Sequence, residues 1–186
     1  MEKNHFITGK RIYLRLLELT DLDGNYVSWL NDPIVSQNNS HHIFPYSKES
    51  AESFIKETFI QNDKLVLAVC VKDDDVHIGN ISLQKIDFFN QTAEFAIMLG
   101  EKEYWGKGYS KEAAELIIHH GFNTMNLKRI HCGTFENNMA MQKLAKYLGF
   151  IEEGRRREAF FKNGKFIDII EFGLLKKEYY NKFNII

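Results

Sequence analysis

The turn that decides the fold of this chain reads Tyr104-Trp105-Gly106-Lys107-Gly108-Tyr109-Ser110-Lys111-Glu112-Ala113. It follows a strand-like stretch and opens a helix-like one. Gly106 and Gly108 can take backbone angles that a Cβ forbids, and they let a ligand approach the main chain closely. Because unpaired amides and the positive end of the dipole meet at a helix start, we expect this turn to bind a phosphate group.

Two familiar phosphate-binding motifs do not fit this turn. A P-loop needs Gly-x-x-x-x-Gly-Lys-Ser/Thr, whereas Gly108 follows Gly106-Lys107 here. A dinucleotide fingerprint needs a third glycine where Lys111 stands, and an acidic residue after a following strand. The spacing therefore indicates another class of phosphate site.

The turn resembles the pyrophosphate loop of the GNAT superfamily of N-acetyltransferases, whose signature is Gln/Arg-x-x-Gly-x-Gly/Ala at a strand-to-helix junction. The resemblance covers nearly the whole chain, and its sharpest pieces are YWGKGYSKEA and the later ENNMAMQKLAKYLGF. The chain is most similar to the branch that acetylates ribosomal-protein N-termini, spermidine and certain bacterial amino sugars. Glu103 stands where the signature has Gln or Arg, which is a departure from the family pattern.

The resemblance implies an α/β (α+β) fold, with a single GNAT domain over residues 1–186. Its central sheet is mixed and mostly antiparallel, with about seven strands flanked by about four helices. In the family this sheet splays open where the pantetheine arm of the cofactor lies. The order read from the residues is β-α-α-β-β-β-α-β-α-β-β, which matches the family, and no linker or repeat interrupts it.

Residue patterns place the elements of the first half. Alternation predicts a strand over residues 11–17. A helix is predicted from a cap at Thr20 to Pro33, with an apolar face of Leu22, Tyr26, Trp29 and Leu30. A second helix is predicted to open at Ser47, with an apolar stripe of Ala51, Phe54, Ile55 and Phe59. Residues 65–71, 78–83 and 92–99 are the next predicted strands.

The second half is predicted in the same way. A helix follows the glycine turn, with Ala114, Ile117, Ile118, Gly121 and Phe122 at helical spacing. Residues 129–134 form a strand, and a last helix runs from its cap at Asn138 to Gly149. Asn163-Gly164 predicts a tight hairpin that joins strands over 154–161 and 165–175.

Composition limits the function classes. With 24 basic and 25 acidic residues the net charge is −1, which removes the basic footprint of a nucleic-acid binder. No apolar run is long enough to cross a membrane, and the two cysteines, Cys70 and Cys132, lack metal-site or disulfide spacing, so we expect a cytoplasmic protein. Fifteen Phe and eight Tyr leave two alternatives open: an aromatic-rich core, or aromatics that line a cleft or a homodimer interface.

The resemblance implies acetyl-CoA as the cofactor. In the family the edge of the fourth strand pairs with the pantetheine arm, which places Ile97, Met98 and Leu99 beside it. The pyrophosphate then falls on the turn, at Trp105, Gly106, Lys107, Gly108, Tyr109 and Ser110. Family members also place an asparagine near the pantetheine or the thioester, at the position of Asn138; the alternative is that Asn138 serves only as a helix cap.

The reaction requires a neutral amine, so a base is useful. Glu94 is the one acid in an apolar strand, and alternation puts it beside Ala96 and Met98 on one face. The family often has an acid here, and Glu94 could accept a proton directly or through a water. The alternative is a structural glutamate paired with Arg11 or Arg15.

No general acid is assigned. Many family members use a tyrosine in the fourth helix, and that position is Ala145 here. Tyr147 lies two positions further, about 200° around the helix, and is a poor substitute. Tyr104 and Tyr109 flank the turn and are weaker candidates, and the departing thiolate can also take its proton from water.

Two pairs of neighbouring residues, His131-Cys132 and His41-His42, have side chains that serve as nucleophiles or metal ligands in other proteins. His131-Cys132 cannot form a nucleophile pair, because neighbours in a strand face opposite sides. His41-His42 lacks a third ligand at metal spacing, so no metal site is predicted. In the family the loop between the first two helices borders the acceptor pocket, so His41, His42, Phe44 and Tyr46 are candidate substrate contacts; an ordinary exposed loop is the alternative.

The leading hypothesis is an acetyl-CoA-dependent N-acetyltransferase that acts on a primary amine of a small molecule or a peptide. An amino-sugar nucleotide, a protein N-terminus and a polyamine are distinct acceptors, and the segment Trp29 to Pro33 resembles members that act on amino sugars. A non-catalytic acyl-CoA-binding module is one alternative, and a protein that binds ATP at the turn is another. Neither nucleic acid nor membrane is an expected partner.

Overall fold

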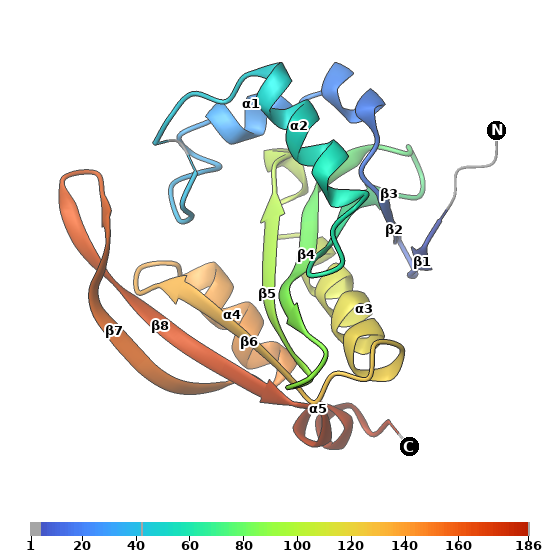
Figure 1. Cartoon of the computed structure of the whole chain (residues 1–186), viewed down its shortest axis with the longest axis vertical. Helices are drawn as coiled ribbons and strands as arrows, with labels where there is room; N and C mark the ends of the chain where they lie inside the picture. The colour runs from blue at the N-terminus through green and yellow to red at the C-terminus, as the bar shows by residue number, and fades with distance from the viewer. Residues whose placement is uncertain (1–4, 42, 186) are drawn as a thin grey trace.

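The computed structural model describes residues 5–41 and 43–185. His42, one of the expected substrate contacts, lies outside the described residues. Figure 1 shows one central sheet with helices on both of its faces. The strands are β1 (Ile7–Thr8), β2 (Ile12–Leu16), β3 (Leu65–Val71), β4 (His77–Asp87), β5 (Thr92–Leu99), β6 (Arg129–Phe135), β7 (Ile151–Lys162) and β8 (Lys165–Leu175).

The helices follow the expected order with one addition. The α-helices are α1 (Tyr26–Asn31), α2 (Lys48–Thr58), α3 (Tyr109–Asn123), α4 (Met139–Leu148) and α5 (Lys176–Phe183). Two 3-10 turns, η1 (Leu19–Asp23) and η2 (Lys102–Tyr104), precede α1 and the glycine turn. In the part of the chain that the structure describes, no helix has both the length and the apolar character needed to cross a bilayer.

The sheet has the order β1-β2-β3-β4-β5-β6-β8-β7. Its pairs are antiparallel except β5–β6, which is parallel. That parallel pair holds only three register positions and ends at Glu94 opposite His131. On its other edge β5 stays paired with β4 as far as Leu99 opposite Gly79. The sheet therefore opens between β5 and β6 beyond Glu94, as the family resemblance implied.

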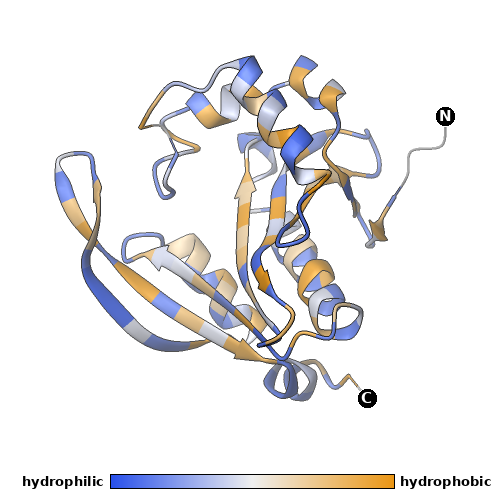
Figure 2. Ribbon diagram, in the orientation of Figure 1, coloured by the Kyte–Doolittle hydropathy of each residue, from blue (hydrophilic) through white to orange (hydrophobic). Residues whose placement is uncertain are grey.

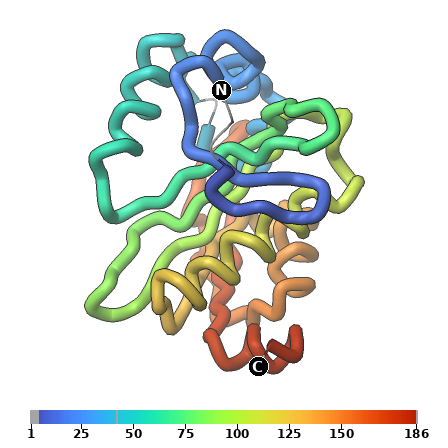
Figure 3. Tube along the Cα trace, turned by 90° about the vertical axis from the view of Figure 1, so that its right-hand side faces the viewer, coloured from blue at the N-terminus to red at the C-terminus, as the bar shows by residue number. Residues whose placement is uncertain are grey.

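Two apolar cores cover the two faces of the sheet. One core packs the face that carries Leu14, Ile81 and Phe95 against α3, α4 and Tyr179 of α5. The other packs the face that carries Tyr13 and Ala68 against η1, α1 and α2. In Figure 3, α2 and α4 lie on opposite sides of the strands. Glu94 belongs to the face of α1 and α2, because its neighbours Ala93 and Phe95 point into the α3 core.

The expected fold class is confirmed, with differences in detail. The sheet has eight strands within the described residues because a two-residue strand, β1, pairs with β2, and α5 is a fifth helix there. Both were missed: β1 is too short to show a period, and α5 is polar with Tyr179 as its buried residue. The predicted first helix is two pieces, η1 and α1, separated at Gly24.

The apolar stripe predicted for α2 is partly wrong. Ala51 and Ile55 are buried, whereas Phe54 is 36% and Phe59 51% exposed. Ala51 and Ile55 lie four residues apart and share one narrow face, so the sheet buries that face and leaves the flanking aromatics at the surface. The predicted strand over 78–83 extends to Asp87, where polar residues continue the pairing with β5 past a bulge.

Candidate active site

The glycine turn has the geometry that its residues predict. Gly106 and Gly108 have φ angles of 72° and 85°, in the left-handed region, and α3 begins at Tyr109 with Gly108 as its N-cap. A Cβ built on Gly106 would meet nothing within 4 Å. Glycine is therefore required there by the backbone angle and not by a lack of space. Lys111 and Glu112 donate their amides to the Gly108 carbonyl, and the preceding amides lack an intrahelical acceptor. The turn therefore presents a helix start to open space.

Arg11, from the loop before β2, holds this turn in place. Its Nη1 donates to the Lys107 carbonyl at 3.0 Å, and its guanidinium lies 4.5 Å from the centre of the Tyr109 ring. Its Nε bonds Glu112 Oε2 at 3.0 Å, and its own amide donates to Glu112 Oε1 at 2.7 Å. Burial opposes ionisation of Glu112, but these bonds outweigh it and hold the pKa of that carboxyl below its usual value.

Trp105 ties the other end of the turn to β5. Its indole Nε1 donates to the carbonyl of Leu99, the last residue of β5, at 3.0 Å. Tyr104, one residue earlier, donates its hydroxyl to Asp74 in the β3–β4 turn at 2.7 Å. The turn is therefore fixed to β5 and to the β3–β4 turn, while Arg11 fixes it at the start of α3.

The opening between β5 and β6 leaves Ile97, Met98 and Leu99 with one paired edge. Ile97 and Leu99 pack against the α3 core, and Met98 packs against the α1 core. Among the described residues, no strand pairs with the β6-facing backbone of β5 beyond Glu94. Across the opening, the hydroxyl of Thr134 on β6 is buried and has no hydrogen-bond partner among the described residues. The opening thus offers unused backbone groups and one orphan hydroxyl.

Asn138 caps α4, as its alternative interpretation predicts. Its Oδ1 accepts the amide of Met141 at 3.1 Å. Its Nδ2 donates to the Asn38 carbonyl at 3.4 Å, in the loop between α1 and α2. Asn138 therefore links the start of α4 to that loop, and its cofactor contact stays a prediction.

Glu94 lies at the point where the β5–β6 pairing ends. Its side chain is 29% exposed, and Lys85 Nζ lies 2.7 Å from its Oε2. Lys85 has a φ of 49° and sits at the β4 bulge that follows the Gln84–Glu94 pair. Because residues alternate between faces, Lys85 would point away from Glu94 in a regular strand, so the bulge turns it toward the carboxylate. Sequence reasoning missed this lysine, since a bulge has no period.

The predicted partners of Glu94 were wrong. Arg11 pairs with Glu112, and Arg15 pairs with Asp21. Glu94 does form an ion pair, with Lys85, but that lysine is 77% exposed. An ion pair with so exposed a partner is worth about 0–1 kcal/mol, so Lys85 can move aside at little cost.

Tyr147 and Tyr104 are poorly suited to donate a proton at the site. Ala145 is fully buried, and Tyr147 is 37% exposed with its hydroxyl 2.5 Å from Glu115, away from that position. The bond that Tyr104 donates to Asp74 raises the pKa of that phenol to about 12. Burial raises the pKa of Cys132 to about 12 as well, which fits its place in the core and removes it as a nucleophile.

The loop between α1 and α2, residues 32–47, brings the described acceptor candidates together. His41 Nδ1 lies 2.8 Å from the Tyr46 hydroxyl, and Asn31 accepts the Tyr46 amide and donates to its carbonyl, both at 2.9 Å. Phe44 is 78% exposed. A cavity of about 320 Å³ is lined by Ser40, His41, Ile43, Phe44, Pro45, Tyr46 and Ser50. Burial, with the Lys162 charge nearby, lowers the pKa of His41.

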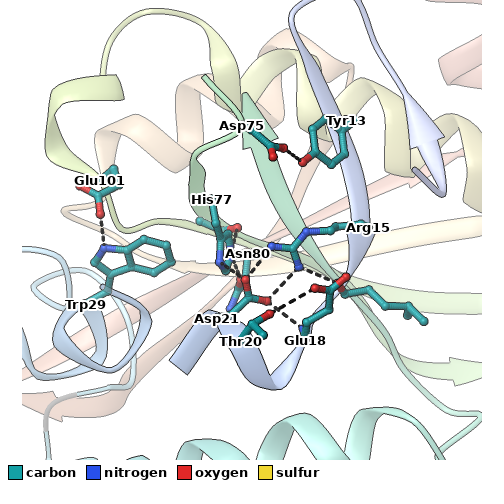
Figure 4. A network of polar contacts seen from close by, with 12 residues as sticks. Tyr13, Arg15, Glu18, Thr20, Asp21, Trp29, Asp75, His77, Asn80 and Glu101 are labelled. Carbon is teal, nitrogen blue, oxygen red and sulfur yellow. Dashed lines mark hydrogen bonds and ion pairs between the residues drawn. The ribbon is translucent and has the colours of Figure 1, made fainter. Parts of the chain in front are cut away.

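A buried polar network under α1 was not predicted (Figure 4). Arg15 Nη2 contacts Asp21 Oδ1 at 2.6 Å, and His77 Nδ1 lies 3.2 Å from that same oxygen. His77 Nε2 lies 2.9 Å from Asn80 Oδ1. Burial disfavours the Asp21 charge, yet the bonds from Arg15 and His77 outweigh it and keep the pKa of Asp21 far below its usual value. The sequence placed Asp21 only next to the helix cap predicted at Thr20, and it did not indicate the network because Arg15 and His77 come from two different strands.

Trp29 of α1 is a scaffold residue. Its Nε1 donates to Glu101 Oε1 at 2.9 Å, and a Cβ on Gly100 would lie 1.9 Å from the Trp29 ring. Asp32 accepts a bond from Lys102 at 2.7 Å. The segment from Trp29 to Asp32 therefore braces the chain between β5 and the glycine turn.

Comparison with known proteins gives this geometry its context. Residues 11–151 match the acetyltransferase (GNAT) domain family. The chain belongs to the GNAT family. It is 33% identical to the N-acetyltransferase p20 of Bacillus licheniformis over 174 residues, which cover 91% of this chain and 96% of that protein. It is 29% identical to the spermidine N(1)-acetyltransferase of Vibrio cholerae over 179 residues, which cover 94% and 98%.

A solved structure extends the comparison. The crystal structure of spermidine N-acetyltransferase from Vibrio cholerae in complex with CoA and spermine matches with a TM-score of 0.84 and 25% identity, over 92% of this chain and 99% of that one. The chain is therefore an N-acetyltransferase of the GNAT family, and its cofactor is acetyl-CoA.

The residues present fit this cofactor. The turn at Gly106 and Gly108 offers helix-start amides of the kind that bind phosphate. The open edge of β5 offers backbone groups to an amide-bearing arm, and the Thr134 hydroxyl is an orphan donor on the facing strand. When bound, acetyl-CoA supplies a thioester whose acetyl group an amine can accept.

Proposed function

We propose that this protein acetylates the primary amine of a small molecule in a ternary complex, with Glu94 as the general base. One observation carries the proposal: the β5–β6 opening ends at Glu94, on the strand that leads into the glycine turn. A ligand that lies along the open edge of β5 from the turn would end beside this carboxylate. Glu94 faces the side of α1 and α2, where the loop over residues 32–47 lies.

A base is needed because the acceptor arrives protonated. Only about one part in 2,500 of a lysine-like amine is neutral at pH 7, against roughly a tenth of an α-amino group. Glu94 would remove the proton directly or through a water and leave the nitrogen lone pair free to attack. Lys85 Nζ lies 2.7 Å from this carboxylate and, at 77% exposure, can leave it free for an incoming amine.

Within this proposal, a polyamine is the more specific candidate for the amine acceptor. Its support is the similarity over almost the full chain to proteins named spermidine acetyltransferases. The amino-sugar hypothesis rests on the resemblance of the segment Trp29 to Pro33, in which Trp29 and Asp32 bond Glu101 and Lys102. No bond of that segment among the described residues adds support for an amino sugar. A polyamine also needs a base more than an α-amine does, which suits Glu94.

A thiol-release assay tests the proposal. Purified protein with acetyl-CoA would be given spermidine, spermine, an amino-sugar nucleotide and a peptide with a free N-terminus. We expect CoA release that saturates with the concentration of a small amine. Among the four acceptors, a polyamine should give saturation at the lowest concentration. Saturable acetyl-CoA binding without acceptor-stimulated release on any of these amines would instead favour a non-catalytic acyl-CoA-binding module. Greater thermal stabilisation by ATP than by acetyl-CoA would favour a nucleotide-binding protein.

A further inference from the structure

Lys162, the last residue of β7, reaches across the molecule to the loop between α1 and α2. Its Nζ donates to the carbonyls of Ser36 at 2.6 Å, Asn39 at 2.5 Å and His41 at 2.9 Å. The residues joined are 121 to 126 positions apart in the chain. In Figure 1 the loop extends toward the tip of the β7–β8 hairpin, which curves away from the other strands.

The chemistry of this contact is unusual for a lysine. Lys162 is only 9% exposed, and no acidic side chain of the described residues forms an ion pair with it. An ammonium has three donors, and here three main-chain carbonyls receive them, so the buried charge is fully hydrogen-bonded. Bonds from a charged donor are roughly twice as strong as neutral ones. A lysine at the surface would donate to water and would make none of these bonds to the loop. The burial of Lys162 and its three bonds therefore indicate that it holds the loop in place.

The hairpin turn after Lys162 and the loop that it contacts are each fixed by further contacts. Asn163 and Gly164 have φ angles of 52° and 78°, which makes the tight two-residue turn that follows Lys162 and fixes its direction. On the loop, the His41 carbonyl accepts a hydrogen bond from Lys162, and His41 is also one of the residues that line the 320 Å³ cavity. Asn138 holds the same loop through Asn38, at the start of α4. The loop is thus hydrogen-bonded both to the tip of the β7–β8 hairpin and to the start of α4.

We propose that Lys162 is a positioning residue for acetyl transfer, which holds residues 36–41 against the β7–β8 hairpin and so shapes the pocket that receives the amine. This inference rests on the function proposed above. Without the ammonium, the buried carbonyl of Ser36 and the part-buried carbonyls of Asn39 and His41 lose their donor. The loop then loosens, and binding of the acceptor must order it. Arg11 and Trp105 hold the glycine turn, and neither forms a hydrogen bond with residues 36–41 among the described residues.

Substitution of Lys162 by Met tests the proposal, because Met fills similar volume without donors. We expect the acceptor KM to rise about tenfold, while the acetyl-CoA KM stays within about twofold, since only the acceptor wall loses its support. Hydrogen exchange at the amides of residues 36–41 should speed up about tenfold. Lys165→Met is the matched control: Lys165 pairs with Lys162 across the hairpin turn and is exposed, and it should change neither quantity.

Three results would overturn the inference. An unchanged acceptor KM with unchanged exchange would show that the contact holds nothing, and an equal rise of both KM values would show general loosening. If Lys162→Met does not fold, Lys162→Gln is measured in its place, since its amide has two donors against three in the ammonium. Wild-type exchange at residues 36–41 together with a wild-type acceptor KM would then count against the inference. The exchange measurement needs no turnover, so a wild-type protein inactive on every amine would refute the proposed function, while exchange would still decide whether Lys162 holds the loop.

Discussion

The cofactor side and the acceptor side of this molecule are built in different ways. The glycine turn takes its shape from the backbone angles of Gly106 and Gly108, two residues apart, and is held in place by Arg11, which lies 101 residues before its partner Glu112. The acceptor side takes its shape from Lys162 and Asn138, which reach main-chain carbonyls of a loop 100 or more residues away. Figure 2 shows how hydrophilic the outer strand β7 is, so that strand has little apolar surface to fix it. Changes on one side should therefore affect the affinity for one substrate only.

The largest effect is expected from Gly108→Val. At a φ of 85° a β-branched residue is strained, and a Cβ there would also lie 3.4 Å from Arg11 Nη2. We expect the turn to open and the affinity for acetyl-CoA, measured by calorimetry, to fall about 100-fold or more, which is about 2.7 kcal/mol. The acceptor KM should stay near the wild-type value if the two sides are independent.

Gly154→Ala is the control for that substitution. Gly154 lies on β7, its φ is not in the left-handed region, and an added Cβ would meet nothing within 4 Å. It should leave the acetyl-CoA affinity unchanged. If the Gly108→Val protein binds acetyl-CoA with wild-type affinity, this turn is not the binding site of the cofactor's pyrophosphate.

Glu94→Gln should give the next largest effect, because Glu94 lies where the two sides meet. General bases contribute about 100-fold or more, so we expect kcat with an alkylamine to fall about 100-fold while acetyl-CoA affinity is kept. Glu171→Gln is a matched control, since Glu171 is also ion-paired and its exposure is 30%, against 29% for Glu94. Equal kcat values for the two variants would leave Glu94 as a structural ion-pair partner of Lys85.

Much of the cofactor side was predictable because its information is local. Two glycines at a strand-to-helix junction show themselves within ten residues. The cap at Asn138 is also a one-residue signal, although its bond to the acceptor-side loop is not. The acceptor side was less predictable. No pattern joins Lys162 to Ser36, the bulge that turns Lys85 toward Glu94 has no period, and the Arg15–Asp21–His77 network exists only after β2 and β4 enter one sheet.

Thr134→Val should give a smaller change in cofactor affinity than the substitution in the glycine turn. The hydroxyl is buried without a partner in the described residues, so its replacement by a methyl group should leave the melting temperature of the free protein equal or higher. If the hydroxyl bonds the cofactor, the dissociation constant for CoA should rise about fivefold, the value of one hydrogen bond. A higher melting temperature with unchanged CoA affinity would mean that the hydroxyl is only an unsatisfied group in the core.

The smallest effect concerns the support of the turn by Glu112. Its pKa is lowered in the folded protein, because the bonds from Arg11 outweigh burial, so its stabilising contribution is fully present above the ordinary glutamate pKa of about 4.3 and is lost as the pH falls through the lower folded value. Glu112→Gln should therefore reduce the free energy of unfolding in urea by about 0.5–1 kcal/mol at pH 6, a modest figure because Arg11 is 44% exposed. The difference between the two proteins should shrink as the pH falls from about 5 toward 3, since only the wild-type side chain titrates there. A difference that stayed constant over this range would show that the neutral hydrogen bonds, and not the charge, hold the start of α3 to Arg11.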